Sequence, residues 1–485
     1  MKMKMTSLGL TVTLLVACMV TMALEIQPVQ ASGTIYIRAD GSVDPSIAPI
    51  LTADNVTYTF TDNILDSVVV ERDNIVLDGA GFTVQGTVGV TGIDLSYRSN
   101  VTFQNTTIKG FSSRPGIQLY SSSNNTIRGN TITNNFHGIL LNRFSNFNTI
   151  RGNNITESNG CGIGADSCSN NTFRDNHISG SSWKGISFYS CSNNTICGNY
   201  VTNNGDEGIH LGPGCNFNTV SENKITENSY GISIEGSNNQ VLHNNFINNQ
   251  YGGIFASGSS NNTVGNNNVT NPLGACLILS NTFYNIIVNN NIARGSFGGI
   301  NLAGSSFNTL TGNNIAENTD GIYPADSSNN TVTNNNITSN GRGVFLVDSS
   351  DNRFYHNGFV DNSYQVHIMK SAYANIWDDG YPSGGNYWSD HVCIGNPSDG
   401  SQPYVLDDNN IDQYPFQNLN GWLHHLAVDV NGDGKVDIQD LGIAASAFGS
   451  YPEHPRWYPN ADVNGDDKTD LKDIALIAKH FGETC

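Results

Sequence analysis

The feature that most constrains the fold is a motif, Asn-Thr-[Ile/Val/Phe]-x-x-Asn-x-[Ile/Val], that recurs about every 23 residues over most of the chain. Its first Asn stands at Asn125, Asn148, Asn171, Asn194, Asn218, Asn239, Asn262, Asn285, Asn308, Asn330 and Asn352. A fixed period of this length is typical of a solenoid, in which each repeat contacts only its neighbours. A solenoid has no single central cleft, so we expect any chemistry on a stripe along one side.

Further columns appear when the repeats are aligned on that Asn. An apolar residue stands two places on, a second Asn five places on, another apolar residue seven places on, and a Gly-Ile or Gly-Val pair about fourteen places on. The apolar runs are short and rich in β-branched residues, which favours strands over helices. Three short strands per turn predict a parallel β-helix, with like residues stacked roughly 4.8 Å apart. The two Asn columns are then amide ladders.

Looser repeats at Asn74 and Asn100 and a last one at Asn375 bring the expected number of coils to about 13. At ~4.8 Å per coil, the rod would be on the order of 60 Å long. We therefore predict an N-terminal cap over 32–73, the β-helix over 74–390, a cap and linker over 391–427, and a separate domain over 428–485.

Residues 1–31 have the pattern of a secretory signal peptide. Lys2 and Lys4 precede an apolar stretch, and the small residues around Ala31 favour cleavage before Ser32. The alternative is a lipoprotein box ending at Cys18, although apolar residues continue past it. No later stretch reaches the roughly 18 apolar residues that span a bilayer. We expect an exported protein that is secreted and extracellular, or attached to the cell surface.

The formal net charge is −20, so the chain lacks the basic surface typical of a nucleic-acid-binding protein. The same charge argues against binding to anionic membranes. It also argues against strongly anionic substrates, unless calcium bridges them. Eight cysteines remain after cleavage, which permits disulfides in an exported protein. Cys168, Cys191 and Cys215 share one column. Three interpretations of this column are open: a stack of small side chains, one disulfide, or a metal site. We favour the stack.

A duplicated acidic motif near the C-terminus predicts two calcium sites. Calcium prefers six to eight hard oxygen ligands, and a loop with ligands at positions 1, 3, 5, 7, 9 and 12 wraps them round one ion. The first loop offers Asp429, Asn431, Asp433, the carbonyl of Lys435, Asp437 and Asp440. The second offers Asp462, Asn464, Asp466, the carbonyl of Lys468, Asp470 and Asp473. Asp467 replaces the turn glycine of the second loop. The left-handed backbone conformation expected there costs more free energy for aspartate than for glycine.

A short apolar helix ending in Phe-Gly follows each loop. Pro455 and Pro459 argue against the helix that an EF-hand would need before the second loop. This duplicated loop-helix unit closely resembles a type I dockerin, which implies calcium binding and a cohesin partner on a scaffolding or surface protein. Loop positions 10 and 11 hold Ile438-Gln439 and Leu471-Lys472 rather than the Ser/Thr pair of many clostridial dockerins, so the identity of the cohesin stays open.

The coils and the segment from Trp377 to Asp390 resemble the NosD-like family over roughly 33–425. The resemblance implies a right-handed parallel β-helix. The same repeat occurs in carbohydrate-binding and sugar-hydrolysing β-helices, so it specifies the fold better than the activity. NosD itself is an accessory in maturing a copper enzyme, but the sequence has no Met-rich or His-rich cluster to support copper handling.

The richest stripe of chemical groups directly precedes the Gly-Ile column. Its members and their neighbours are His137, Cys161, Trp183, Lys184, Asp206, Glu207 and Tyr230. We take Lys184, Asp206 and Glu207 as candidate catalytic residues, and His137, Trp183 and Tyr230 as candidate glycan-binding residues. The alternative, which we favour, is that these are solvated residues at a loop bulge. Asp206 and Glu207 would point to opposite faces of a strand, which weakens them as a pair.

Three functions fit these patterns. The first is a polysaccharide-associated protein that is docked to a cohesin and binds, or also degrades, a glycan. The second is a non-enzymatic surface or adhesive protein. The third is a NosD-like accessory of a copper enzyme, which copper uptake at the Cys168 column would favour.

Overall fold

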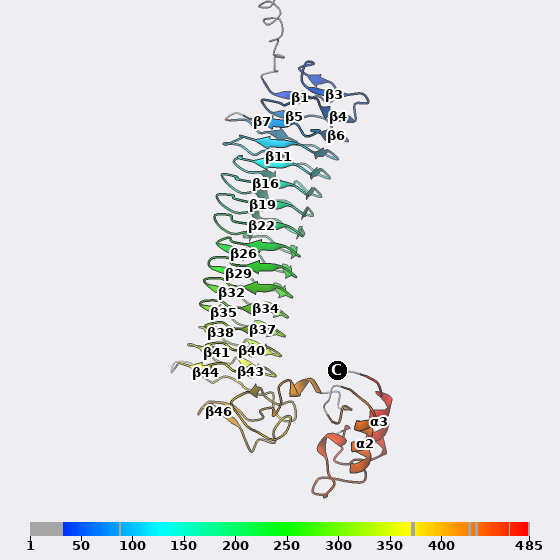
Figure 1. Ribbon diagram of the computed structural model, residues 1–485, viewed down its shortest axis with the longest axis vertical. Coiled ribbons are helices and arrows are strands. Elements are labelled where there is room, and N and C mark those ends of the chain that lie inside the picture. The colour runs from blue at the N-terminus through cyan, green and yellow to red at the C-terminus, as the bar shows by residue number, and fades with distance from the viewer. Residues whose placement is uncertain are drawn as a thin grey trace, which may run out of the picture.

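The computed structural model describes residues 33–86, 89–369, 374–424, 428–431, 435–464 and 466–483. The predicted signal peptide and the alternative cleavage site at Cys18 lie outside these ranges. The coils stack into a rod of about 13 turns, a parallel β-helix as the repeats predict (Figure 1). No helix in the described ranges is long and apolar enough to cross a membrane.

Three sheets run the length of the rod, and we call them A, B and C. In spatial order, sheet A contains β2 (Val43–Asp44), β1 (Ile35–Ile37), β5 (Val68–Val70), β8 (Ile93–Asp94), β11 (Ile117–Tyr120), β14 (Ile139–Asn142), β17 (Ile163–Asp166), β20 (Ile186–Tyr189), β23 (Ile209–Leu211), β26 (Tyr230–Ile234), β29 (Gly252–Ser257), β32 (Ala275–Ser280), β35 (Gly298–Ala303), β38 (Asp320–Ala325), β41 (Arg342–Leu346) and β44 (Tyr364–Ile368).

Sheet B contains β3 (Ile50–Thr52), β4 (Thr57–Phe60), β6 (Val76–Asp78), β9 (Thr102–Gln104), β12 (Thr126–Arg128), β15 (Thr149–Arg151), β18 (Thr172–Arg174), β21 (Thr195–Cys197), β24 (Thr219–Ser221), β27 (Gln240–Leu242), β30 (Thr263–Gly265), β33 (Ile286–Val288), β36 (Thr309–Thr311), β39 (Thr331–Thr333) and β42 (Arg353–Tyr355).

Sheet C contains β45 (Tyr387–Trp388), β43 (Gly358–Val360), β40 (Asn336–Thr338), β37 (Asn314–Ala316), β34 (Asn291–Ala293), β31 (Asn268–Thr270), β28 (Asn245–Ile247), β25 (Lys224–Thr226), β22 (Tyr200–Thr202), β19 (His177–Ser179), β16 (Asn154–Thr156), β13 (Thr131–Thr133), β10 (Thr107–Lys109) and β7 (Thr83–Gln85). The remaining elements are β46 (Tyr404–Asp407), β47 (Asn410–Asp412), η1 (Gly421–His424), α2 (Ile438–Ala447), η2 (Pro459–Ala461) and α3 (Leu471–Lys479).

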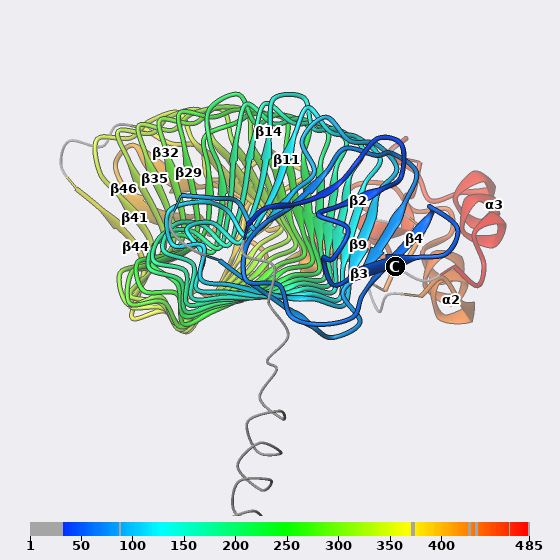
Figure 2. The ribbon, with the colours of Figure 1, turned by 90° about the horizontal axis from the view of Figure 1, so that it is seen from above.

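The predicted columns are confirmed by the strand register. Ile127 pairs with Ile150 in sheet B, Ile132 with Ile155 in sheet C, and Ile186 with Ile209 in sheet A. All of these side chains are fully buried, so strands of all three sheets contribute residues to the core. Seen from above, the strands of successive coils overlie one another (Figure 2). The first strands of sheets A and B precede residue 74, where we expected the β-helix to begin.

Both predicted Asn columns form buried ladders. Asn153 shows the pattern: its Nδ2 donates to Oδ1 of Asn176 at 3.0 Å, and its Oδ1 accepts from the backbone N–H of Asn130 at 3.1 Å. Each ladder amide thus satisfies the backbone at a corner where strand pairing stops. The left-handed residue is the one before each ladder Asn, as at Asn124 (φ 58°) and Gly152 (φ 61°).

A third ladder stands ten places after the first Asn of the motif, and sequence analysis missed it. In it, Nδ2 of Asn204 donates to Oδ1 of Asn228 at 3.0 Å. Its members are Asn135, Asn204, Asn228, Asn249, Asn318, Asn340 and Asn362. Ser158, Ser181, Pro272 and Gly295 interrupt the column in the sequence, which hides its period.

The cysteine column is a stack of free, fully buried thiols, as favoured above. The backbone N–H of Cys168 donates to Sγ of Cys191 at 3.4 Å, as the N–H of Ser122 donates to Oγ of Ser145 at 3.2 Å in earlier coils. Cysteine therefore replaces serine in a fourth, smaller ladder.

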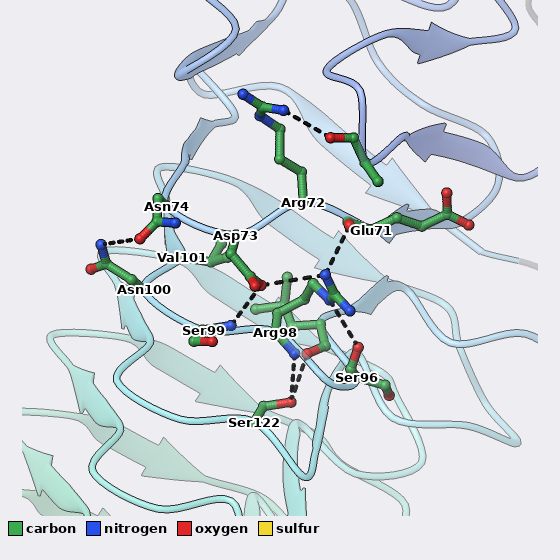
Figure 3. Close-up of polar contacts among 12 residues, drawn as sticks. Glu71, Arg72, Asp73, Asn74, Ser96, Arg98, Ser99, Asn100, Val101 and Ser122 are labelled. Atoms are coloured by element: carbon green, nitrogen blue, oxygen red, sulfur yellow. Dashed lines mark hydrogen bonds and ion pairs between the residues drawn. The ribbon is translucent and has the colours of Figure 1, made fainter.

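The looser coils at the N-terminal end are joined by an ion pair as well as by an Asn contact. The Arg98 guanidinium donates to the carbonyl of Glu71 at 2.8 Å and lies 3.3 Å from the Asp73 carboxylate (Figure 3). Nδ2 of Asn100 donates to Oδ1 of Asn74 at 2.9 Å beside it. These contacts hold together coils whose repeats contain more residues than the regular repeat of about 23.

Aromatic rings close the other end of the core. Trp377 stacks on Phe354 with ring centroids 4.5 Å apart, and Trp388 stacks on Phe359 at 4.3 Å. Both Trp side chains are 1% exposed. Nε1 of Trp388 donates to Asp412 at 2.8 Å, and burial raises the pKa of that carboxyl to about 7. The open end of the apolar stack is thereby shielded from water.

Candidate functional site

Two successive coils bring the three candidate catalytic side chains together where the chain enters sheet A. Nζ of Lys184, just before β20, lies 3.1 Å from Oε2 of Glu207 and 3.9 Å from Oδ2 of Asp206. The side chains of Lys184 and Glu207 are 17% and 13% exposed, whereas Asp206 is 52% exposed. This is a half-buried ion pair, so the solvated alternative does not describe Lys184 and Glu207.

Asp206 and Glu207 do not lie in a strand, so the alternation that would point them to opposite faces does not apply to them. Both carboxylates approach Lys184, because they lie in the turn before β23, where the alternation of strand side chains has not begun. The turn therefore allows two neighbouring acids to share one cation.

His210 completes the cluster, and sequence analysis missed it. It lies between the core residues Ile209 and Leu211 of β23, so its ring stands on the outer face of sheet A. Its register partners are the small residues Ser187 and Ser233. The ring is 3% exposed, and neither ring nitrogen has a hydrogen-bond partner among the described residues. The sequence did contain a sign of this site, because a histidine takes the outward position that serine takes on the two adjacent coils.

Burial and charge shape the titration of this cluster. Desolvation, helped by the nearby Lys184 charge, lowers the pKa of His210 to about 4, even though Nδ1 lies 3.9 Å from Glu207. Desolvation and the neighbouring Glu207 carboxylate raise the pKa of Asp206. Desolvation acts to lower the pKa of Lys184, but attraction to Glu207 outweighs it and the net shift is upward. At neutral pH the cluster thus holds a neutral imidazole beside a lysine-carboxylate pair.

Aromatic rings flank the polar centre. Trp183 is 55% exposed, and Tyr189 lies 5.1 Å from the His210 ring between centroids. Tyr230 stacks on Phe255 with centroids 5.3 Å apart. Nδ1 of His137 accepts from the backbone N–H of Cys161 at 3.0 Å, and burial lowers the pKa of that imidazole. Exposed rings beside a few convergent polar groups are typical of ligand sites.

The first predicted calcium loop is described only in part, because Asp433 lies outside the described residues. Asp440 is fully buried and accepts from the backbone N–H groups of Asn431 and Asp437 at 3.0 and 2.8 Å. Asp437 caps α2 through the N–H of Gln439. Asp429 is 5% exposed.

The second loop repeats this arrangement. Asp473 accepts from the N–H of Asn464 at 3.2 Å, and Asp470 caps α3. Asp467 has φ 60°, the left-handed turn expected where the first loop has glycine. Nζ of Lys472 lies 3.1 Å from Asp466. Within the described ranges no three His, Cys, Asp or Glu side chains converge as a metal site. The oxygen-only set of donor residues nevertheless fits the ligand chemistry of calcium.

We predict that the buried imidazole makes stability depend on pH. In the unfolded chain this histidine takes up a proton as pH falls below its pKa of about 6.5. In the folded protein His210 takes up a proton only near pH 4, because its pKa is lowered to about 4. Stability is therefore lost as pH falls through this window, by roughly 3 kcal/mol from this group. His210→Gln should remove that part of the dependence in denaturant unfolding between pH 7 and pH 4.

The matched control is His177→Gln, because His177 is exposed on β19. This variant should keep the wild-type profile. A His210→Gln profile that coincides with wild type would contradict the buried, neutral assignment.

Comparison with solved structures gives similar folds at low identity. The periplasmic alginate epimerase AlgG is 13% identical with TM-score 0.41, covering 70% of this chain and 84% of that one. The AlgE4 A-module of Azotobacter vinelandii, a mannuronan C-5 epimerase, is 14% identical with TM-score 0.37, covering 71% and 90%. The Dettilon tailspike protein is 12% identical with TM-score 0.39, covering 64% of each chain, which is less than two thirds of its length. No curated protein matches the chain by sequence.

Three family models match successive parts of the chain. The right-handed beta helix region matches residues 55–246, and the periplasmic copper-binding protein NosD matches 207–298 and 283–393. The dockerin type I domain matches 427–482. These matches agree with the stacked coils and with the two loop-helix units. The chain is a NosD-like right-handed parallel β-helix protein with a C-terminal type I dockerin.

Proposed function

We propose that this protein binds a glycan on the outer face of sheet A and is held by a cohesin through its dockerin. The observation that carries the first part is the cluster of Lys184, Glu207 and His210. Two buried ring nitrogens without a hydrogen-bond partner among the described residues lie beside a charged pair that is only partly exposed. Buried polar groups without partners cost about 1–3 kcal/mol each, which a ligand hydroxyl would offset.

The aromatic neighbours support a sugar rather than a small ion. Pyranose rings present apolar C–H faces as well as hydroxyls, so they need both stacking surfaces and polar partners. Trp183 and Tyr189 are exposed, and Tyr230 is partly exposed beside Phe255. Trp183 and Tyr189 belong to the coil of β20 and Tyr230 to the coil of β26, two coils further on, so an extended glycan could contact them in turn along the rod.

Cleavage of that glycan is a second candidate function, favoured by the two carboxyls. Asp206 keeps its proton to a higher pH than an ordinary aspartate, whereas Glu207 pairs with a lysine. Acid-base cleavage of a glycosidic bond requires two carboxyl groups, one acting as acid and the other as base or nucleophile. Asp206 would donate the proton to the leaving oxygen, and Glu207 would act as base or nucleophile.

The glycan proposal is tested by incubating the protein, with calcium, with neutral polysaccharides. Retention and released oligosaccharides are measured together. Glu207→Gln should weaken retention about tenfold, since it replaces a charged hydrogen-bond partner. Trp183→Ala should weaken it without changing the melting temperature, because that ring is 55% exposed. If product is released, Asp206→Asn should abolish its release.

Glu235→Gln is the matched control, since Glu235 is exposed beside β26 on the same sheet. Retention that is unchanged in Glu207→Gln and Trp183→Ala would place the glycan elsewhere. No retention of any polysaccharide would favour the structural, adhesive alternative. Copper binding by the thiols of Cys168, Cys191 and Cys215 would favour the copper-accessory alternative.

The docking proposal rests on the dockerin and its calcium chemistry. Type I dockerins generally bind calcium and a cohesin, and this domain has a core of its own around Val430, Ala444 and Ile477. In each loop, the residues at positions 1, 3, 5, 9 and 12 would supply side-chain oxygens to calcium and the residue at position 7 its carbonyl. Bound calcium would supply the positive charge that holds the acidic loops together.

We expect Asp429→Ala combined with Asp462→Ala to remove calcium binding in calorimetry of the full chain, because each variant loses the first ligand of a loop. The melting transition of the rod should stay unchanged. Undiminished calcium heats in the double variant would show that the two loops are not the sites.

A further inference from the structure

Three arginines stack in register on the outer face of sheet B, away from the cluster on sheet A. Arg128 of β12 pairs with Arg151 of β15, and Arg151 pairs with Arg174 of β18. Paired positions on neighbouring strands lie roughly 4.8 Å apart, so the row runs along the rod with one guanidinium per coil. In a chain of net charge −20 this row is a local reversal of sign.

A hydrogen bond to a neutral amide holds one end of this row, and an ion pair holds the other end. Nε of Arg128 donates to Oε1 of Gln104 at 2.7 Å, and Nη1 of Arg174 lies 2.7 Å from the Asp175 carboxylate. Arg151, in the middle, has no side-chain hydrogen bond or ion pair to any described residue. Like charges directly opposite each other on paired strands are destabilising. The central guanidinium thus leaves its donors and its charge available to a ligand.

The surface beside the row is hollowed. Gln104, Asn105, Arg128, Gly129, Arg151 and Gly152 line a hollow of about 380 Å³. Gly129 and Gly152 have left-handed φ values of 64° and 61°, and a Cβ on Gly152 would meet no atom within 4 Å. The missing side chains leave open space next to the guanidinium groups. On the next coil Asp175 occupies the equivalent corner, with a left-handed φ of 55°.

We propose that this arginine row binds an anionic polysaccharide that carries a carboxylate on successive sugars and runs along the rod. Guanidinium groups bind carboxylates through two parallel N–H bonds, and their fixed fork makes them suited to this task. A linear polyuronate offers one carboxylate per sugar, and the row offers one guanidinium per coil. The hollow at Gly129 and Gly152 would admit the sugar rings.

Nucleic acid fits this surface less well than a polyuronate. Duplex DNA carries one charge per roughly 1.7 Å of axis and is usually bound by broad basic surfaces. Here the row is one residue wide and the rest of the chain is acidic. The overall charge therefore selects against dense polyphosphates and permits a polymer of lower charge density.

The test compares retention of the full chain by polygalacturonate, by its fully methyl-esterified form and by single-stranded DNA, at low and high salt. The variant is Arg128→Gln, Arg151→Gln and Arg174→Gln together. We expect wild type to bind polygalacturonate more tightly than the ester, and the variant to bind it at least about tenfold more weakly. Retention should also fall with salt, since the row is solvent-accessible.

The matched control is Arg143→Gln, Arg294→Gln and Arg353→Gln, which removes the same charge from exposed arginines elsewhere on the rod. It should retain polygalacturonate, with both triple variants melting as cooperatively as wild type. Equal losses in both triple variants, or equal binding of the ester, would overturn the proposal. DNA binding as tight as that of polygalacturonate would also overturn it, in favour of an unspecific polyanion surface.

This inference is independent of the site on sheet A. Trp183→Ala should leave salt-sensitive retention by polygalacturonate intact, while it weakens binding at the Lys184 cluster. Loss of polygalacturonate retention in Trp183→Ala but not in the arginine triple variant would place the anionic glycan on sheet A and overturn the assignment to sheet B.

Discussion

The hydrogen bond from one buried Asn side chain to the next coil is the interaction on which the rest of this structure depends. A short strand cannot satisfy its backbone where the chain turns, and an unpaired buried N–H costs about 1–3 kcal/mol. The ladder amides provide the missing hydrogen-bond acceptors at the turns. For example, Oδ1 of Asn171 accepts from the backbone N–H of Asn148 at 2.8 Å. Three such ladders and a column of Ser and Cys fix the height and rotation of each coil.

Because buried residues fix the register of the coils, the residues on the outer surface are free to vary. The inward columns repeat nearly the same residues, whereas outward positions change from coil to coil. Lys184 and Glu207 meet because their coils are neighbours and their turns overlie each other. The arginine row of sheet B arises in the same way from residues 23 apart in the sequence. Functional groups on such a rod are therefore built as columns.

Much of the fold could be predicted from the sequence, because the period exposes the columns directly. Ile150 and Asn153 could be assigned to a core strand and a ladder from spacing alone. The third ladder could not, since serine, proline and glycine interrupt it. His210 was missed because the burial of its ring depends on side chains such as Tyr189 and Glu207, and the repeat pattern does not show where those side chains lie. The burial of Glu207 was missed for the same reason.

The most direct test of this account compares two adjacent asparagines. Asn153 is a buried ladder residue, and Asn154 is exposed at the start of β16 with no side-chain hydrogen bond to a described residue. Denaturant unfolding of Asn153→Ala should show a loss of at least about 2 kcal/mol, because the N–H of Asn130 loses its acceptor. Asn154→Ala should stay within about 0.5 kcal/mol of wild type. Equal effects of the two substitutions would contradict the claim that the ladders hold the coils in register.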